Sequence, residues 1–299
     1  MWLDTVLPHL SDLHVRNLAW LLAGPGLLDR DDGYWRQRSL PATCLPPTLG
    51  DALLRLDAAP APLHRWIESE LDGRLGRYAE RLWEYGFAFL CGANLLARGL
   101  AIKDGASTVG ELDFLVDWPA EGVVHIETAF KLYLAVEAVA DPSQCVGPNP
   151  SDCLADKLKR LRDHQLPLAS SALAQAQMPL PAARSVACVG GWLFHRQAPA
   201  NAVPEVSRQH AHGWWRRPGE AWPVSPGSRI VMLQRLQWIA PVHASTAAGC
   251  LDEAEAQVRL HFTHSHKPVL LAELGLDGEI GRGVIVPAGW PERRHGEPR

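Results

Sequence analysis

Two adjacent segments of alternating polarity constrain the fold of this 299-residue chain more than any other feature. They cover residues 110–117 and 123–133, and five turn-like residues join them. In the first segment Leu112, Phe114 and Val116 point one way while Glu111, Asp113 and Asp117 point the other way, and the second segment alternates similarly. Because successive side chains on a strand point to opposite faces, this pattern predicts an antiparallel hairpin with one apolar and one polar face.

The polar face of the predicted hairpin brings two carboxylates together. With a turn centred on Ala120, Asp113 faces Glu127 on the neighbouring strand. Facing Cβ atoms lie only ~5 Å apart, and two carboxylates that close repel each other unless a cation or a proton lies between them. Lys131 follows on the same face. The pattern favours a divalent metal bound by the two carboxylates, with an ammonium nearby; the alternative is a solvent-exposed polar face without a ligand.

The segments around the hairpin predict an α/β fold with a mixed sheet flanked by helices. From about residue 74 the expected order is α-β-β-β-α-β. The helices of this core are expected at about 74–91 and 152–164, and its strands at 96–102, 111–117, 123–134 and 185–194.

We expect one domain over residues 1–299, with this core at 71–200. A helical extension precedes it at 1–70, and a Trp-rich, β-containing extension packs on it at 201–299. Strands in the last part are expected at 230–238, 258–262, 269–274 and 283–286.

Composition limits the function in one direction. The formal net charge of -4 excludes a chain that binds nucleic acid through bulk positive charge, but it allows a local basic face. The six cysteines include no CxxC pair, which favours reduced thiols. The N-terminus does not resemble a signal peptide, and no apolar run reaches the ~18 residues of a membrane span. We therefore expect a cytoplasmic protein without an organic cofactor.

The residues of the hairpin resemble a known enzyme core. The stretch from Gly110 to Asp113, followed by His125-Ile-Glu127 and Lys131, resembles the Asp…Glu-x-Lys motif of the restriction-endonuclease-like PD-(D/E)XK phosphodiesterase superfamily. More narrowly, the chain resembles a bacterial domain-of-unknown-function family that is grouped with this superfamily. The segments that fit the narrower family are Leu75–Tyr78, Gly110–Leu115, Gly147–Asn149, His164–Leu166, Gly213–Trp215 and Trp238–Pro241.

The resemblance implies a nuclease with a Mg²⁺ (or Mn²⁺) site. It implies that Asp113 and Glu127 bind the metal and that a helix carboxylate, Glu80 or Glu84, completes the site. The alternative for Glu80 and Glu84 is ordinary pairing with arginines on the surface of the helix.

One position departs from the motif of the superfamily. The motif places its Lys two residues after the Glu, where this chain has Ala129. Lys131 lies on the same face but ~6.6 Å further along the strand, and it is the residue expected to polarise the attacking water. A degenerate module that binds nucleic acid or a protein partner without hydrolysis is therefore the alternative function.

A basic helix follows the hairpin. Lys157 and Arg160 are expected to contact phosphates, together with Gln165 near the end of the helix. The alternative is a solvated helix with mixed ion pairs. Two histidine groups, at 210–212 and 261–266, have no accompanying Cys or Glu at ligand spacing and are interpreted as surface residues. The tryptophans of the C-terminal third are expected to fill the core rather than to stack on bases.

Overall fold

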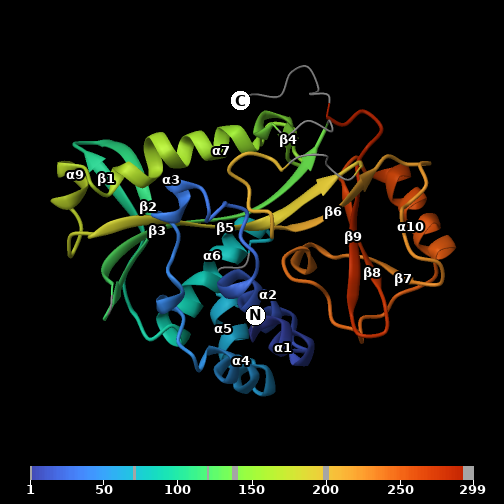
Figure 1. Cartoon of the computed structure of the whole chain (residues 1–299), viewed down its shortest axis with the longest axis horizontal. Coiled ribbons are helices and arrows are strands. Elements are labelled where there is room, and N and C mark those ends of the chain that lie inside the picture. The colour runs from blue at the N-terminus through green and yellow to red at the C-terminus, as the bar shows by residue number, and fades with distance from the viewer. Residues whose placement is uncertain (1, 70–71, 120, 137–140, 198–201, 292–299) are drawn as a thin grey trace.

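The computed structural model describes residues 2–69, 72–119, 121–136, 141–197 and 202–291. These residues contain one mixed sheet of nine strands, ordered β1-β2-β3-β5-β6-β9-β8-β7 with β4 paired to β3 (Figure 1). The strands are β1 (Asn94–Asp104), β2 (Ser107–Trp118), β3 (Gly122–Ala135), β4 (Cys145–Val146), β5 (Arg184–His195), β6 (Ala211–Arg216), β7 (Arg229–Met232), β8 (Val269–Leu274) and β9 (Glu279–Ile285).

The helices lie on both sides of this sheet. They are α1 (Trp2–Val6), α2 (Leu13–Ala23), α3 (Gly33–Arg36), α4 (Leu49–Ala58), α5 (Ala61–Glu68), α6 (Leu75–Tyr85), α7 (Leu154–Arg160), α8 (Leu166–Leu168), α9 (Ala172–Gln175) and α10 (Leu251–His264). Wider π-helical turns extend α6 to Leu90 and α7 to Gln165. None of the helices in the described residues is both long and apolar enough to span a membrane.

The predicted hairpin register is confirmed where the two strands pair. In β2 and β3, Phe114 lies opposite Ile126 and Trp118 lies opposite Gly122. The expected centre of the turn, Ala120, is outside the described residues. The core elements follow in the expected order, α6, β1, β2, β3, α7 and β5, with the short β4 as the one addition among the described strands.

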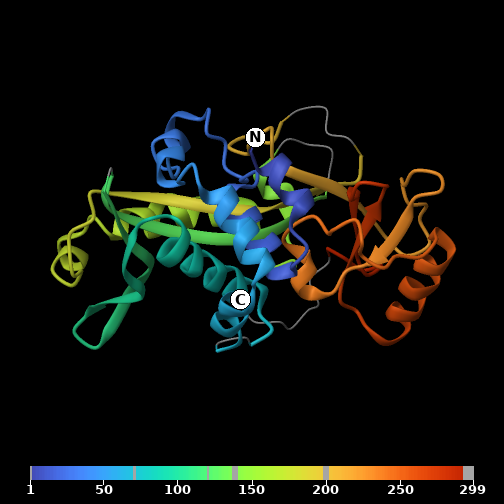
Figure 2. The ribbon, with the colours of Figure 1, turned by 90° about the horizontal axis from the view of Figure 1, so that it is seen from below.

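Two apolar layers hold the centre of the sheet. Alternate residues of the central strands, such as Phe114, Ile126 and Phe130, join one core cluster with residues of α2 and α6. Residues of the opposite parity, such as Tyr133 and Leu193, belong to another cluster with α7. Figures 1 and 2 show α7 on one side of these strands and α6 with α1, α2, α4 and α5 on the other. The alternation in the sequence therefore specifies both faces.

The C-terminal part continues the same sheet. Strand β6 pairs in parallel with β5 and with β9, and β8 and β7 extend the sheet beyond them. The tryptophans expected in the core are largely there, since Trp192, Trp215, Trp238 and Trp290 are each at most 7% exposed. The indole N–H of Trp215 donates to the Ala135 carbonyl of β3 at 2.8 Å, which ties the two parts of the sheet together.

Two strand expectations in this part are wrong. Residues 258–262 lie inside α10, where Ala254 and Val258 are buried at helical i,i+4 spacing while Leu260 is 62% exposed. The short run of alternate apolar residues therefore did not mark a strand. Of residues 230–238 only the first few belong to β7, and a 3₁₀ helix occupies Arg235–Trp238. Strand β6 was not anticipated.

Candidate functional site

The two carboxylates of the hairpin lie where their strands diverge. The β2–β3 ladder extends to Phe114 opposite Ile126, and Asp113 is the next residue of β2. Its side chain continues the contact, because the Thr128 backbone N–H donates to Asp113 Oδ2 at 2.8 Å. Glu127, the predicted partner on β3, is completely buried. The register thus places both carboxylates at one position along the hairpin.

Both oxygens of Glu127 accept hydrogen bonds. The His125 ring lies on the same strand face, with Nε2 2.9 Å from Glu127 Oε1. The other ring nitrogen, Nδ1, lies 3.1 Å from Ser185 Oγ of β5. On the opposite side, the Gln165 amide donates to Glu127 Oε2. These contacts fix the orientation of a carboxylate that is removed from solvent.

A half-buried lysine completes this chain of contacts. Lys157 Nζ donates to Gln165 Oε1 at 3.0 Å, so that α7 is linked to Glu127 through one amide. Burial lowers the pKa of Lys157, although the charges of Glu127 and Asp113 act in the opposite direction. The Lys157 ammonium is therefore within electrostatic range of both hairpin carboxylates.

Burial and neighbouring negative charges raise the pKa of two of these carboxyl groups, Asp113 and Glu80. Burial, and then the charges of Glu127 and Glu80, raise the pKa of Asp113 above the usual range. Burial likewise raises the pKa of Glu80, with Glu111 and Glu127 adding to it while Arg98 and Arg77 oppose it. Glu80 on α6 is thus within electrostatic range of both hairpin carboxylates, and the group favours a bound proton or cation.

The other helix carboxylate, Glu84, is engaged elsewhere. It forms ion pairs with Arg81 on its own helix and with Arg98 on β1, the latter at 3.2 Å. Its carboxylate is mostly buried in this arrangement. Glu84 therefore pairs with arginines, which was the alternative to metal binding. The charge of Glu80, by contrast, raises the pKa of Asp113 on the hairpin.

The structure gives Lys131 a different partner from the one expected. Its ammonium lies 2.7 Å from Asp152 Oδ2, just before α7, so Asp152 holds it in an ion pair. Lys157, expected only as a phosphate contact, is joined to Glu127 instead. Arg160, one turn further along α7, is exposed and so can meet a polyanion.

The donor set suits a hard divalent cation with few protein ligands. Mg²⁺ is commonly held by one or two carboxylates with waters in the remaining positions. Within the described ranges, no three His, Cys, Asp or Glu side chains are arranged so that they hold a metal ion together. Each carboxylate oxygen of Glu127 keeps a second lone pair. Asp113 and Glu127 therefore fit an ion that is bound by two carboxylates, with Glu80 contributing charge.

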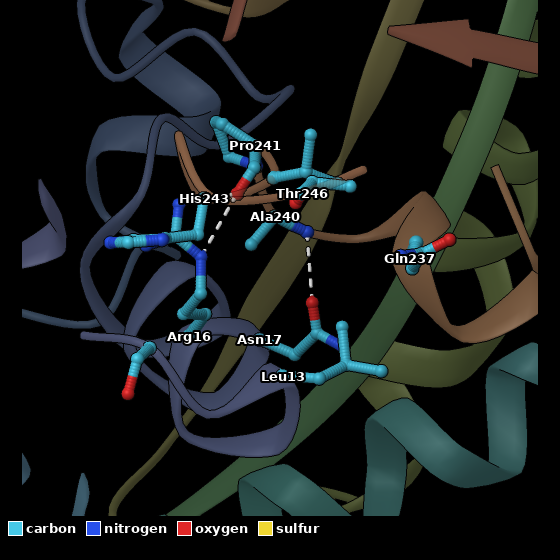
Figure 3. Close-up of a pocket in the computed structure, with 10 residues that line it drawn as sticks. Leu13, Arg16, Asn17, Gln237, Ala240, Pro241, His243 and Thr246 are labelled. Atoms are coloured by element: carbon cyan, nitrogen blue, oxygen red, sulfur yellow. Dashed lines mark hydrogen bonds between the residues drawn. The ribbon is translucent and has the colours of Figure 1, made fainter. Parts of the chain in front are cut away.

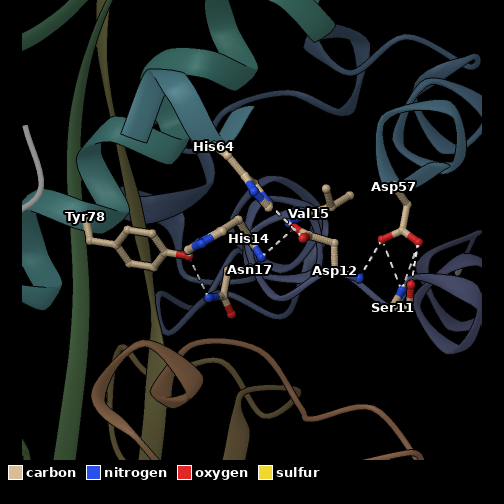
Figure 4. Close-up of polar contacts among 8 residues, drawn as sticks. All are labelled: Ser11, Asp12, His14, Val15, Asn17, Asp57, His64 and Tyr78. Atoms are coloured by element: carbon tan, nitrogen blue, oxygen red, sulfur yellow. Dashed lines mark hydrogen bonds and ion pairs between the residues drawn. The ribbon is translucent and has the colours of Figure 1, made fainter. Parts of the chain in front are cut away.

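A second polar cluster lies at the start of α2 and is accounted for by the fold. Figure 4 shows Asp12, whose carboxylate accepts from the backbone N–H groups of His14 and Val15 and lies 2.8 Å from His64 Nε2. The Tyr78 hydroxyl lies 2.7 Å from His14 Nδ1. These bonds satisfy the first turn of the helix and join it to its neighbours.

A small pocket of about 110 Å³ adjoins this cluster (Figure 3). Arg16 and Asn17 line it, but Arg16 donates to the Pro241 carbonyl and Asn17 accepts from the Ala240 N–H. With these polar groups satisfied, the pocket walls join the N-terminal helices to the C-terminal part. We therefore assign no ligand to it.

The family comparison covers nearly the whole chain. Residues 16–285 match the sequence model of the family described as a domain of unknown function, DUF1853. The chain belongs to this family. No curated protein matches it, and no solved structure does. The DUF1853 match includes every element that carries the carboxylate site, from α6 through β2 and β3 to α7.

Sequence reasoning missed the two contacts of the His125 ring, one of which orients Glu127. His125 precedes it by two residues on a strand, and this spacing alone places both side chains on one face. Ser185, the second partner of the His125 ring, comes from a strand 60 residues later. The first contact had a signal in the sequence; the second depended on the parallel pairing of β3 with β5.

Proposed function

We propose that this DUF1853 chain is a metal-dependent phosphodiesterase that acts on nucleic acid and has a core of the restriction-endonuclease-like PD-(D/E)XK type. The observation that supports this proposal best is the grouping of Asp113 and Glu127 with a half-buried ammonium, that of Lys157, which is linked to Glu127 through Gln165. The order of helices and strands around the hairpin agrees with such a core.

Each residue has a separate task in this proposal. Asp113 and Glu127 bind the metal, and His125 and Gln165 hold Glu127 in place. When bound, Mg²⁺ or Mn²⁺ supplies Lewis-acid polarisation of a phosphoryl oxygen and a more acidic water. Lys157 adds positive charge beside the scissile phosphate.

The surroundings supply charge of both signs. Glu80 favours cation binding at this site, because its negative charge raises the pKa of Asp113. Arg160, exposed on α7, contacts the backbone of the nucleic acid. Lys131 holds Asp152 at the start of α7 and in this way helps to position the helix that carries Lys157.

A non-hydrolytic binding module is the second candidate. The specific observation in its favour concerns Lys131, the lysine nearest to the motif position of the superfamily. Its ammonium already forms an ion pair with Asp152. In that case nucleic acid or a protein partner binds without cleavage. Metal binding without turnover is its signature.

Cleavage assays with isosteric variants test the proposal. Wild-type protein is incubated with DNA and RNA substrates and Mg²⁺ or Mn²⁺. We expect Asp113→Asn and Glu127→Gln to lose more than about 100-fold in rate, since removing outer partners of a metal site alone costs about 10- to 100-fold. Lys157→Met should lose rate while it retains metal binding in calorimetry.

Asp104→Asn is the matched control, because Asp104 is an exposed carboxylate at the end of β1. It should cleave like wild type. Equal cleavage by wild type, Asp113→Asn and Glu127→Gln would refute the assigned site. Metal binding that both substitutions abolish, with no cleavage of any substrate, would support the binding module instead.

A further inference from the structure

Three histidines lie close together where β5 ends and β6 begins. His195 ends β5, and His210 and His212 lie immediately before and within β6. The ring centroids of His195 and His210 are 6.1 Å apart, and those of His210 and His212 are 6.0 Å apart. The His210 ring thus lies between the rings of His195 and His212 in the series, although His195 comes from β5 and the other two from β6 and the residue before it.

The strand register explains why these rings share a face. In the parallel pairing of β5 with β6, Leu193 lies opposite His212 and His195 lies opposite Trp214. Residues two apart on a strand point to the same face, so His195 and His212 both project from the face that carries Leu193. His210, two residues before His212, continues this side of the chain.

Two of these rings present an unused nitrogen inside the protein. The Nε2 atoms of His195 and His210 are buried and have no hydrogen-bond partner among the residues that the structure describes. His195 is itself only 9% exposed. Buried polar atoms are almost always paired with protein, water or an ion, so these two nitrogens are available to a water or a metal ion.

The tautomer of His210 is determined by its surroundings. Its Nδ1 lies 2.5 Å from the Ser207 carbonyl, and because a carbonyl oxygen only accepts, Nδ1 carries the hydrogen. The neutral ring then has its lone pair on Nε2. A histidine that donates Nδ1–H to a backbone carbonyl while its Nε2 lone pair is free is arranged as metal-binding histidines commonly are.

Burial disfavours the charged form of two of these rings, those of His195 and His210. Burial, and then the neighbouring rings of His210 and His212, lower the pKa of His195 to about 4. Burial lowers the pKa of His210 as well. Neutral imidazole is the form that binds a metal ion.

From this geometry we propose that the protein binds a borderline transition-metal ion, of the Zn²⁺ class, through Nε2 of His195 and Nε2 of His210. Nitrogen ligands select such ions over Mg²⁺. No complete set of three ligands is preformed in the part of the chain that the structure describes. The exposed His212 supplies a third imidazole by side-chain rotation, and water fills the remaining position.

This site is separate from the proposed nuclease centre. His195 is paired with Ala135 of β3, eight residues after Glu127, which is roughly 26 Å along the strand. The two sites also differ in chemistry, with oxygen ligands at one and nitrogen ligands at the other. The inference therefore does not depend on the proposed function.

Metal titration of the whole protein tests the inference. Protein stripped with a chelator is titrated with Zn²⁺ by calorimetry and with Co²⁺ by visible absorption, in excess Mg²⁺ so that the carboxylate site is occupied. We expect one Zn²⁺ per chain, Co²⁺ absorption typical of nitrogen ligation, and a higher melting temperature with Zn²⁺, since a ligand of the folded state stabilises it.

The substitutions His210→Asn and His212→Asn separate a metal site from a structural role. In His210→Asn the side-chain amide retains a donor for the Ser207 carbonyl but lacks the Nε2 atom. Each variant should bind Zn²⁺ at least about 10-fold more weakly and should lose the Zn²⁺-dependent rise in melting temperature, while its melting temperature without metal stays near that of wild type.

His264→Gln, at the exposed end of α10, is the control and should bind like wild type. Absence of Zn²⁺ binding by the wild type would overturn the inference, with buried water then satisfying the two nitrogens. Unchanged binding in both the His210 and His212 variants, or an equal loss in His264→Gln, would also overturn it.

Discussion

Asp113 forms a hydrogen bond within the fold and is also a proposed metal ligand. Its carboxylate accepts from the Thr128 N–H at 2.8 Å, which stabilises the ionised form. Burial and the charges of Glu127 and Glu80 outweigh this bond, and the pKa of Asp113 is raised. The ionised carboxyl is therefore costly to the folded state until a cation is bound.

Asp113→Asn should stabilise the metal-free protein. A carboxyl whose folded pKa is raised binds more protons in the folded than in the unfolded state, so its presence lowers the unfolding free energy as the pH rises from about 3.9 to the folded pKa. We expect the variant to gain about 1–2 kcal/mol at about pH 8 and little at about pH 4. The asparagine side chain retains an acceptor for the Thr128 N–H.

Urea unfolding in a chelating buffer across this pH range measures the effect. Asp104→Asn, which changes an exposed carboxylate, should leave the stability unchanged at every pH. A loss of stability at the alkaline end, or the same gain at both ends, would contradict the raised pKa of Asp113.

At the scale of single elements, side-chain hydrogen bonds hold the first turn of α2. Asp12 precedes the helix, and its side chain accepts from the N–H groups of His14 and Val15. Asp57 of α4 in turn accepts from the backbone of Ser11 and Asp12 (Figure 4). The start of α2 is thereby fixed against α4, and α2 then packs on α6, the helix that carries Glu80.

Asp12→Ala should destabilise the protein by about 1–2 kcal/mol, the usual cost of losing a helix N-cap. Asp12→Asn retains the cap acceptor and loses only the charge facing His64. Because partly exposed ion pairs contribute about 0–1 kcal/mol, this variant should lose less than half as much. Chemical denaturation followed by circular dichroism compares the two; equal losses would show that the ion pair, rather than the cap, is what matters.

At the scale of the whole molecule, one buried arginine joins segments that are distant in the sequence. Arg282 of β9 is 1% exposed and donates to the carbonyls of Trp238 and Ala240. It also forms an ion pair with Glu279 at 2.7 Å, and its guanidinium lies 4.2 Å from the centre of a Trp192 ring on β5. The Arg282 guanidinium thus adds a link between the C-terminal strands and the core.

Arg282→Met should cost about 3–5 kcal/mol, because it leaves the Glu279 carboxylate buried without its partner. The double variant Arg282→Met/Glu279→Gln removes that charge, while the new glutamine amide oxygen can still accept from the Val242 N–H as Glu279 does, so it should recover part of the loss. Thermal and urea unfolding compare the three proteins. If the double variant is less stable than Arg282→Met, the unpaired charge is not the source of the loss.

Local sequence patterns determined a large part of this fold. The alternation around residues 110–133 determined the hairpin, its register at Phe114 and Ile126, and the shared position of Asp113 and Glu127, because strand periodicity and turn length are local properties. The same locality explains the failure at residues 258–262, where a short apolar run is compatible with both a helix and a strand.

Only the tertiary structure decided what surrounds the two carboxylates. Lys157 contacts Glu127 through Gln165, Lys131 pairs with Asp152, and Glu84 pairs with Arg98. The rings of His195 and His210 meet because β5 and β6 are parallel neighbours. No local pattern specifies such contacts, since they depend on how helices and strands far apart in the chain are packed. The sequence by itself therefore determined the carboxylate pair, and the packing of α7 and β5 against β3 decided which side chains complete its surroundings.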